Sequence, residues 1–332
     1  MSFERTVILP VAAEVAFDLV TDPARIRRWQ SVACRVDLRL GGEFRYTMGP
    51  GHQATGTFTE IEPGRRLVFD WGWEGSAEVP PGATTVFLTL EPVDGGTALT
   101  LRHEGLGPQQ AASHAEGWNH FLDRLTQYAA TGHPVFDEWN ACPEPENPLV
   151  SAEASLAALQ FALDRLTEAD STHQTPCTEF TVADLVDHLA KNLALIGVAL
   201  GLDLTDRPAL QPEPRIASLA QPVLEAFYGH GLTGELTLGS TSLPASVVAG
   251  ILNLELLVHG WDFAQATAQD FPVDPGLAAY VLGLAHEVIG APQRASGSFG
   301  PPTAIAESAD SMDRLLAFTG RFPAPAGQLS HA

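Results

Sequence analysis

The chain of 332 residues is long enough for two ordinary domains, and with 45% hydrophobic and 17% charged residues it has the composition of a globular protein. Its formal net charge of −22 comes from 40 acidic residues against only 18 Lys and Arg. Nucleic acids and anionic membranes would be repelled by this charge, so we expect neither as a partner.

The N-terminal stretch lacks the features of a secretion signal, because Glu4 and Arg5 interrupt it and no apolar block with a cleavage site follows. No apolar run reaches the roughly 20 residues needed to cross a bilayer, since Asn253 and Glu255 interrupt a long one. The three cysteines form neither a CxxC zinc motif nor a disulfide framework. We therefore expect a cytoplasmic protein.

The first half of the chain is predicted to be a meander of strands that ends in a long helix, because its apolar residues alternate with period two and then recur at helical spacing. The predicted elements are a strand over residues 3–10, short helices over 12–20 and 24–29, strands over 34–40, 44–48, 54–61, 66–73, 85–91 and 97–104, and a helix over 108–130. A bent antiparallel sheet wrapped on such a helix is expected to leave a cavity for a small apolar ligand.

This order of elements resembles the START-like (SRPBCC) superfamily, in its Hsp90-ATPase-activator-homologue branch, over about residues 1–132. The residues that carry the resemblance are Trp29, the Gly41-Gly42-Glu43-Phe44 stretch, and the 114–118 and 122–125 segments of the last helix. The resemblance implies an α+β helix-grip domain, a curved antiparallel sheet on a long C-terminal helix, with a ligand cavity. It implies no catalytic residue, because the superfamily shares none.

Five polar residues near this cavity are candidates for a functional role. His103, Glu104 and His114 could be acid–base groups, and Asp70 and Arg102 could line the cavity. Each is more simply interpreted as a solvated or structural residue, since alternation alone does not say which face of the sheet it takes. Residues 133–149, which are rich in proline, are expected to be a linker.

The second half is predicted to be a helical bundle with four principal helices. Ser151 is expected to cap a helix that reaches about residue 169, and Thr181 another that has Asp184 in its first turn. Pro244 is expected to be the first residue of a long helix that ends near Gln269. Further helices are predicted over residues 217–228, 275–289 and 310–319, and an extended segment over 235–238.

Glu255 and His259 lie four residues apart in the long apolar helix and therefore share one face. A buried polar pair must be hydrogen-bonded, ion-paired or bound to a metal. Spacing alone leaves these alternatives open, and a hydrogen-bonded Glu–His pair is the simpler one. His188 lies beside the inward face of its own helix and is a third possible ligand, in competition with His230 and His286.

A group of three such ligands would leave a coordination position for water or substrate, as catalytic metal sites do. Asp262, one turn beyond His259, or Asp184, one turn before His188, could orient an imidazole from outside the coordination sphere.

Three stretches resemble the DinB-like group that contains mycothiol-dependent maleylpyruvate isomerase, in the same order and over about residues 150–322. They are TPCTEFTVADLVDHL at 175–189, ELLVHGWD at 255–262 and MDRLLAFTGR at 312–321. The resemblance implies an all-α four-helix-bundle (DinB-like) domain over residues 150–332 that binds a divalent metal, zinc first and nickel or iron as alternatives. Carried over position by position, it assigns the ligands to His188, Glu255 and His259.

The preferred interpretation is a metal-dependent enzyme that uses a low-molecular-weight thiol such as mycothiol as an isomerase or S-transferase on an electrophilic small-molecule substrate. A hydrolase with metal-bound water is a variant, and the first domain would hold a hydrophobic ligand. One alternative is a non-enzymatic small-molecule-binding or regulatory protein. The other is a biosynthetic enzyme whose active site is the START-like cavity. No oligomeric state is predicted.

Overall fold

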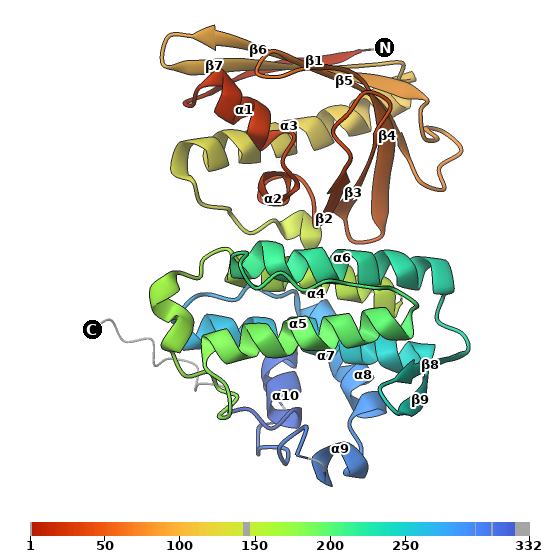
Figure 1. Cartoon of the computed structure of the whole chain (residues 1–332), viewed down its shortest axis with the longest axis vertical. Helices are drawn as coiled ribbons and strands as arrows, with labels where there is room; N and C mark the ends of the chain where they lie inside the picture. The colour runs from red at the N-terminus through yellow and green to blue at the C-terminus, as the bar shows by residue number, and fades with distance from the viewer. Residues whose placement is uncertain (1, 142–146, 296, 307, 323–332) are drawn as a thin grey trace. The chain divides into compact units, whose positions relative to one another are not determined.

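The computed structural model describes residues 2–141, 147–295, 297–306 and 308–322, and the chain divides into two compact units, Met1–Val135 and Phe136–Ala332 (Figure 1). Residues 142–146 of the predicted linker and 323–332 of the predicted second domain lie outside the described residues. Each unit is described by itself.

The first unit is a seven-stranded antiparallel sheet whose buried face carries the long helix α3. The strands follow the order β1-β7-β6-β5-β4-β3-β2, so that only β1 departs from a simple meander. Its elements are β1 (Phe3–Leu9), α1 (Ala13–Leu19), α2 (Pro23–Ile26), β2 (Ala33–Val36), β3 (Glu43–Gly49), β4 (His52–Glu62), β5 (Arg66–Trp73), β6 (Thr84–Val93), β7 (Gly96–Glu104) and α3 (Pro108–Thr131). The predicted α+β class is confirmed.

The register of the sheet shifts at two places, between Phe58 and Glu60 of β4 and between Thr47 and Gly49 of β3. Such an irregularity increases the local twist and lets a sheet curve around a helix. The inward residues are large, because the alternation of β5 buries Leu67, Phe69 and Trp71 on the side of α3. Curvature and aromatic bulk together decide how much space the unit encloses.

Aromatic and aliphatic side chains pack together between the sheet and α3. Phe69 lies 5.1 Å from Phe44 between ring centroids, and Trp71 lies 5.4 Å from Trp118 of α3. A pocket between the sheet and α3 has a volume of about 20 Å³, which is room for about one water molecule. Ligand sites usually measure about 300–1,000 Å³. The pocket at the place of the predicted ligand cavity is therefore water-sized in this structure.

The second unit is mainly helical. Helices α4 and α7 pack together, α5 packs against α6 and α7, α6 also contacts α4, and α8 joins α7 to α10. Its elements are η1 (Glu138–Asn140), α4 (Pro148–Leu163), η2 (Glu168–Thr172), α5 (Val182–Ala199), α6 (Pro212–His230), the hairpin β8 (Glu235–Leu238) and β9 (Thr241–Pro244), α7 (Ala245–Ala266), α8 (Pro275–Val288), α9 (Ala291–Ala295) and α10 (Ser311–Phe318). The predicted helical class of this unit is confirmed.

The helix caps confirm one prediction and correct another. Thr181 caps α5 in a capping box in which its hydroxyl and the Asp184 carboxylate exchange hydrogen bonds with the backbone. Ser151, however, does not cap α4, because that helix begins three residues earlier and Asn147 caps it. Ser151 is instead fully buried inside α4, where its hydroxyl bonds to Asn253 of α7 at 2.6 Å.

Helix α7 is the core of the second unit. It begins at Ala245 and ends at Ala266, so Pro244 is its cap rather than its first residue. Among the described helices it is the one long and apolar enough to cross a membrane by length and composition, yet 83% of its apolar window is buried inside the fold. Because neighbouring elements cover every face of α7, the helix is apolar on all sides.

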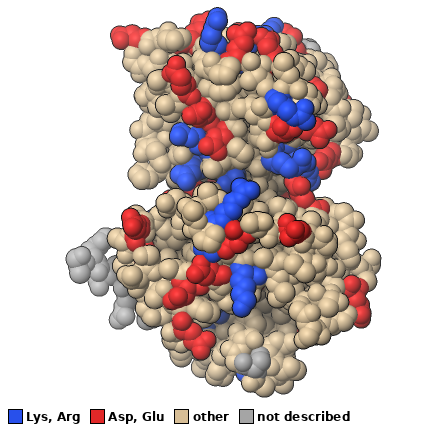
Figure 2. All heavy atoms as spheres, viewed as in Figure 1, with Lys and Arg blue, Asp and Glu red and all other residues tan. Residues whose placement is uncertain are grey.

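Acidic side chains are spread over both units on the face drawn in Figure 2, with Lys and Arg side chains among them. No continuous basic surface is visible on that face.

Candidate metal centre

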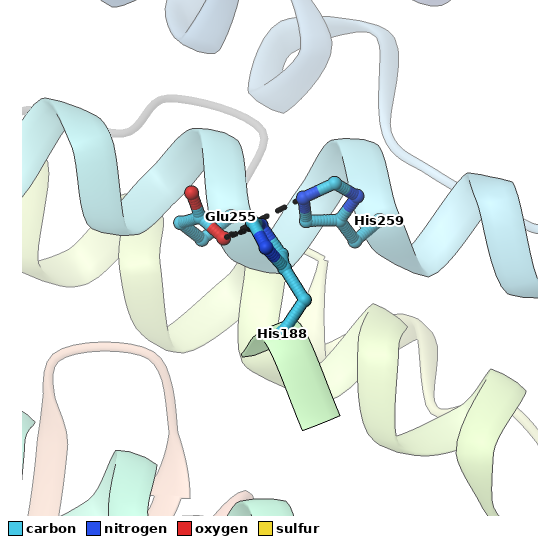
Figure 3. A group of neighbouring side chains, drawn as sticks. All are labelled: His188, Glu255 and His259. Atoms are coloured by element: carbon cyan, nitrogen blue, oxygen red, sulfur yellow. Dashed lines mark ion pairs between the residues drawn. The ribbon is translucent and has the colours of Figure 1, made fainter. Parts of the chain in front are cut away.

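His188 of α5 and the Glu255–His259 pair of α7 converge on one point inside the second unit (Figure 3). The Oε2 atom of Glu255 lies 3.5 Å from the Nε2 atom of His188 and 3.5 Å from that of His259. One ligand atom from each residue lies within 4.8 Å of the other two. The structure thus brings together the three residues that the sequence resemblance named.

The sequence places each of these side chains by a simple local rule. The capping box at Thr181 fixes where α5 begins, and seven residues later His188 lies next to the buried stripe, with its ring 4.9 Å from that of Phe180. Glu255 and His259 are one turn apart on α7, which directs both side chains to α5. The two imidazoles meet edge to face, with centroids 5.2 Å apart.

The site has the properties expected of an ion-binding cradle. The Oε2 atom of Glu255 is buried and has no hydrogen-bond partner, although two imidazole nitrogens face it. Ligands at 2.0–2.1 Å from a tetrahedral zinc ion are about 3.3–3.4 Å apart, close to the 3.5 Å found here. Two imidazoles and one carboxylate also form a common donor set for zinc and for iron. The residues present therefore fit a divalent metal.

His259 is held from its other side by a buried carboxylate. Its Nδ1 atom donates to Oδ2 of Asp262 at 2.9 Å, which leaves Nε2 directed at Glu255. Asp262 is fully buried and also accepts two hydrogen bonds from Arg321, at 3.0 and 2.6 Å. Of the two candidates for this orienting role, Asp262 takes it, whereas the Asp184 carboxylate is engaged at the start of α5.

Burial and charge act against each other on the titratable groups of the site. Burial alone would raise the pKa of Glu255, but His188 and His259 hold it well below its usual value. Burial would lower the pKa of His259, but the hydrogen bond to Asp262 and the nearby carboxylate of Glu255 raise it to about 9. Without a metal, the chain therefore keeps a proton on His259 at neutral pH, and a metal must displace that proton.

Two further polar residues lie near the site. The Nδ2 atom of Asn192, one turn after His188, lies 3.0 Å from the His188 Nε2 atom, the nitrogen that faces Glu255. Cys177 lies outside the three-residue group, and burial raises the pKa of its thiol. A reactive thiolate at this site would thus have to come from a bound molecule rather than from Cys177.

The other histidines proposed as ligands do not reach the site. His230, at the end of α6, is exposed and bonds to the Gly231 carbonyl oxygen at 2.9 Å. His286 of α8 packs on the ring of Phe318, with centroids 4.1 Å apart. Among the described residues, neither belongs to the three-residue group.

The candidates of the first unit have structural partners. Trp118 donates to Nδ1 of His103 at 3.0 Å, so the Nε2 atom of that histidine carries the proton and donates to the Thr84 hydroxyl at 2.8 Å. Trp73 donates to Nε2 of His114 at 3.1 Å. Burial lowers the pKa of His103 to about 3 and also lowers that of His114. His103 is therefore a buried neutral group at neutral pH, and His114 is a partly buried group with hydrogen-bond partners inside the unit.

The remaining three candidates are also engaged. Arg102 pairs with Glu104 on the same strand and lies over the ring of Phe87, 4.4 Å from its centroid. Asp70 accepts a hydrogen bond from the backbone N–H of Thr57 at 3.0 Å. None of the three lines the water-sized pocket.

Sequence reasoning missed Asn192 and Arg321 as residues of the site. The signal for Asn192 was its place one turn after His188, where residues on a helix are neighbours. Arg321 stood at the end of a stretch that carries the family resemblance, but its contact with Asp262 joins residues far apart in the chain.

Comparison with known proteins divides the chain in the same way. Residues 10–130 match the family model of the activator of Hsp90 ATPase homolog 1-like proteins, and residues 152–221 match that of the mycothiol maleylpyruvate isomerase N-terminal domain. The second match includes His188 and ends before Glu255 and His259.

Two known proteins illustrate the similarity, each over part of this chain. The uncharacterized protein Rv0738 of Mycobacterium tuberculosis is 28% identical over 180 residues, which cover 53% of this chain and 98% of that protein. An Hsp90 activator from Plasmodium falciparum has a crystal structure that is 27% identical, covers 40% of this chain and 98% of its own, and has a TM-score of 0.34.

A third similar structure is CalU16 from Micromonospora echinospora, which is 29% identical, covers 40% of this chain and 76% of its own, and has a TM-score of 0.32. The family matches confirm the two resemblances found in the sequence. The chain thus joins a region similar to Hsp90-ATPase-activator homologues, residues 10–130, to a region similar to the N-terminal domain of mycothiol maleylpyruvate isomerase, residues 152–221.

Proposed function

We propose that the second unit binds a divalent metal, zinc first, through His188, Glu255 and His259, and that the protein uses it as a thiol-dependent isomerase or S-transferase on an electrophilic small molecule. The observation that carries the metal proposal is the buried, unpartnered Oε2 atom of Glu255 between two imidazole nitrogens. When bound there, the metal would lower the pKa of a thiol or water ligand so that it is deprotonated at neutral pH.

The charges around the site favour an anionic ligand at the open coordination position. The carboxylates of Glu255 and Asp262 and the guanidinium of Arg321 together carry one net negative charge. A divalent ion changes this to one net positive charge, which a single thiolate or hydroxide would neutralise. A buried site is most stable when its charges are paired, so a monoanion suits it better than a neutral molecule.

The residues of the chain would hold and orient this ligand. Asn192 donates to His188 Nε2 in the metal-free chain. Once a metal takes that lone pair, the Asn192 amide loses its acceptor and can donate to a ligand beside the metal. Because Cys177 is held as a neutral thiol, the sulfur would come from a low-molecular-weight thiol, and the isomerase match suggests mycothiol.

We place the chemistry in the second unit rather than in the first. The pocket between the sheet and α3 of the first unit holds about 20 Å³, and the histidines His103 and His114 of that unit bond to Trp and Thr side chains. An apolar ligand could enter only if aromatic side chains moved. This favours a binding or regulatory role for the first unit over catalysis there.

The test is metal analysis of the purified full chain, followed by His188→Ala and His259→Ala. His230→Ala is the matched control, because that imidazole is exposed at the end of α6. We expect about one metal per chain in the parent and the control, and loss of metal in the two ligand variants. Full occupancy in either ligand variant would contradict the metal proposal.

The reaction is tested separately with maleylpyruvate and mycothiol. An isomerase returns the thiol unchanged after each turnover, whereas an S-transferase consumes one thiol for each product molecule. A metal-loaded protein that neither isomerises the substrate nor consumes thiol, with water-dependent hydrolysis also absent, would leave the metal proposal standing and contradict the enzymatic one.

A further inference from the structure

One buried ion pair connects the last described helix to the candidate metal centre. Arg321 follows the end of α10, and its Nε and Nη2 atoms donate to the two oxygens of Asp262 on α7 at 3.0 and 2.6 Å. The Asp262 side chain is 0% exposed and that of Arg321 is 10% exposed. The pair is therefore bidentate and almost completely removed from water.

The local sequence fixes Arg321 in this position. Gly320 takes a φ of +89°, and a Cβ atom there would lie 2.8 Å from the Cα atom of Gly300, so both the turn and the close approach require glycine. The turn sends the backbone N–H of Arg321 back to the Leu316 carbonyl oxygen at 2.9 Å. Its own carbonyl oxygen accepts from the Thr303 hydroxyl at 2.8 Å.

The Asp262 carboxylate accepts a third hydrogen bond, from His259, in addition to the two from Arg321. An ion pair that only joined α10 to α7 would not need this third donor. Asp262 Oδ2 accepts both from Arg321 and from His259 Nδ1, so the guanidinium and the imidazole share one oxygen atom. This arrangement fixes the rotation of the carboxylate, and through it the tautomer and the direction of the imidazole. The Nε2 atom of His259 is left facing Glu255.

We propose that Arg321 is a positioning residue of the metal site: by locking the Asp262 carboxylate it holds His259 as a preformed ligand and so strengthens metal binding. This inference rests on the proposed metal site. Partners of this kind beyond the ligands typically contribute 10–100-fold to metal affinity. Because coupling is reciprocal, metal binding also stabilises the docking of the α10 end onto α7.

The test compares zinc affinity, measured on the full chain by competition with a chromogenic chelator, in Arg321→Gln, Arg321→Lys and Asp262→Asn. Arg294→Gln is the matched control, because Arg294 also bonds to the end of α10, through the Phe318 carbonyl oxygen at 3.0 Å, and is not bonded to Asp262. We expect Arg321→Gln and Asp262→Asn to weaken zinc binding about 10–100-fold. We expect Arg321→Lys, which keeps the charge but loses the bidentate geometry, to lie between them and the parent.

The control is expected to lower the unfolding temperature and to leave zinc affinity unchanged. Equal affinity in Arg321→Gln and the parent, or an equal loss in Arg294→Gln, would overturn the positioning role while leaving the metal site intact. A parent chain that binds no zinc, nickel or iron would overturn the metal site itself and this inference with it. If Arg321→Gln does not fold, the Arg321→Lys variant carries the comparison.

A second measurement is independent of affinity. Imidazole nitrogen NMR of the zinc-loaded chain should place the His259 proton on Nδ1 in the parent and in Arg294→Gln. In Asp262→Asn we expect that signal to broaden or to shift, because the Nδ1–H group loses its carboxylate acceptor. An unchanged signal in Asp262→Asn would contradict the proposed orientation by Asp262.

Discussion

Each unit contains a pair of histidines in edge-to-face contact, and the two pairs differ in what surrounds them. The centroids of His103 and His114 lie 5.1 Å apart, and those of His188 and His259 lie 5.2 Å apart. The first pair bonds to indole and hydroxyl groups, whereas the second faces the carboxylate of Glu255. The partners, rather than the histidines, separate a core cluster from a candidate metal site.

The pKa values follow the same division. With neutral partners, burial dominates and lowers the pKa of His103 to about 3. Burial also acts to lower the pKa of His259, but the carboxylates of Asp262 and Glu255 outweigh it and raise that pKa to about 9. Desolvation acts in the same direction in both units, so the nearby carboxylates account for the opposite outcomes.

The largest effect that tests this comparison is the loss of metal on removal of a ligand. His259→Ala should lose more affinity than the 10–100-fold expected for a residue beyond the ligands, while His114→Ala should leave metal content unchanged. Metal analysis of the two purified variants makes the measurement. Equal metal loss in both would remove the distinction between the two pairs.

The next largest effect is a loss of folding stability of the first unit at low pH, caused by protonation of His103. Its folded pKa of about 3 lies below the ordinary value of 6.5, so the unfolded chain binds a proton more readily than the folded one. The stabilising contribution is present above pH 6.5 and is lost as pH falls, by roughly 1.4 kcal/mol per pH unit down to about pH 3.

Denaturant unfolding of the full chain between pH 4 and pH 7, followed by tryptophan fluorescence, measures this loss. His103→Gln, which removes the titrating group, should flatten the dependence. A profile in which the parent and the variant have the same slope would contradict the assignment of His103 as a neutral core group.

The second unit should respond to pH in the opposite direction when it is free of metal. The folded pKa of His259, about 9, lies above 6.5, so its contribution to stability is complete below pH 6.5 and is lost as pH rises through 9. The same proton competes with the metal, so zinc affinity should increase between pH 6.5 and 9. Calorimetry in buffers of different ionisation enthalpy should detect proton release on zinc binding, and zinc binding without proton release at pH 7 would contradict this account.

The smallest effect is expected for Asn192→Ala. Because its amide occupies the His188 nitrogen in the metal-free chain, its removal should leave zinc affinity equal or up to a few-fold higher. Binding of a thiol ligand to the zinc-loaded chain should weaken, since a donor worth about 1 kcal/mol is lost. Titration of the zinc-loaded variant with mycothiol checks this, and unchanged thiol affinity would remove Asn192 from the ligand site.

Local patterns predicted most of the fold. Alternation located the strand at 66–73 to the residue, and the Thr181–Asp184 pair marked the start of α5. The start of α4 was missed although Asn147 followed by Pro148 is a common cap signal. The volume of the pocket between the sheet and α3 could not be predicted. The residue pattern shows which face of a strand each residue takes, but it does not give the curvature of the sheet, which sets the enclosed volume.

The residues of the candidate site also fall into those that local spacing predicts and those that depend on contacts between distant segments. The Glu255–His259 pair followed from helical spacing, whereas His188 required the family resemblance, because its approach depends on how α5 packs against α7. The roles of Asp262 and Arg321 depend on a contact between distant segments. The state of His103 depended on which face of β7 it takes, which alternation does not specify.

The most direct test is a crystal structure of the zinc-soaked full chain, with anomalous data collected at the zinc edge. We predict one peak with Nε2 of His188, Oε2 of Glu255 and Nε2 of His259 at about 2.0–2.2 Å, and with Nδ1 of His259 still bonded to Asp262. A zinc ion bound elsewhere in the chain, with Glu255 hydrogen-bonded to a protonated His259, would contradict it.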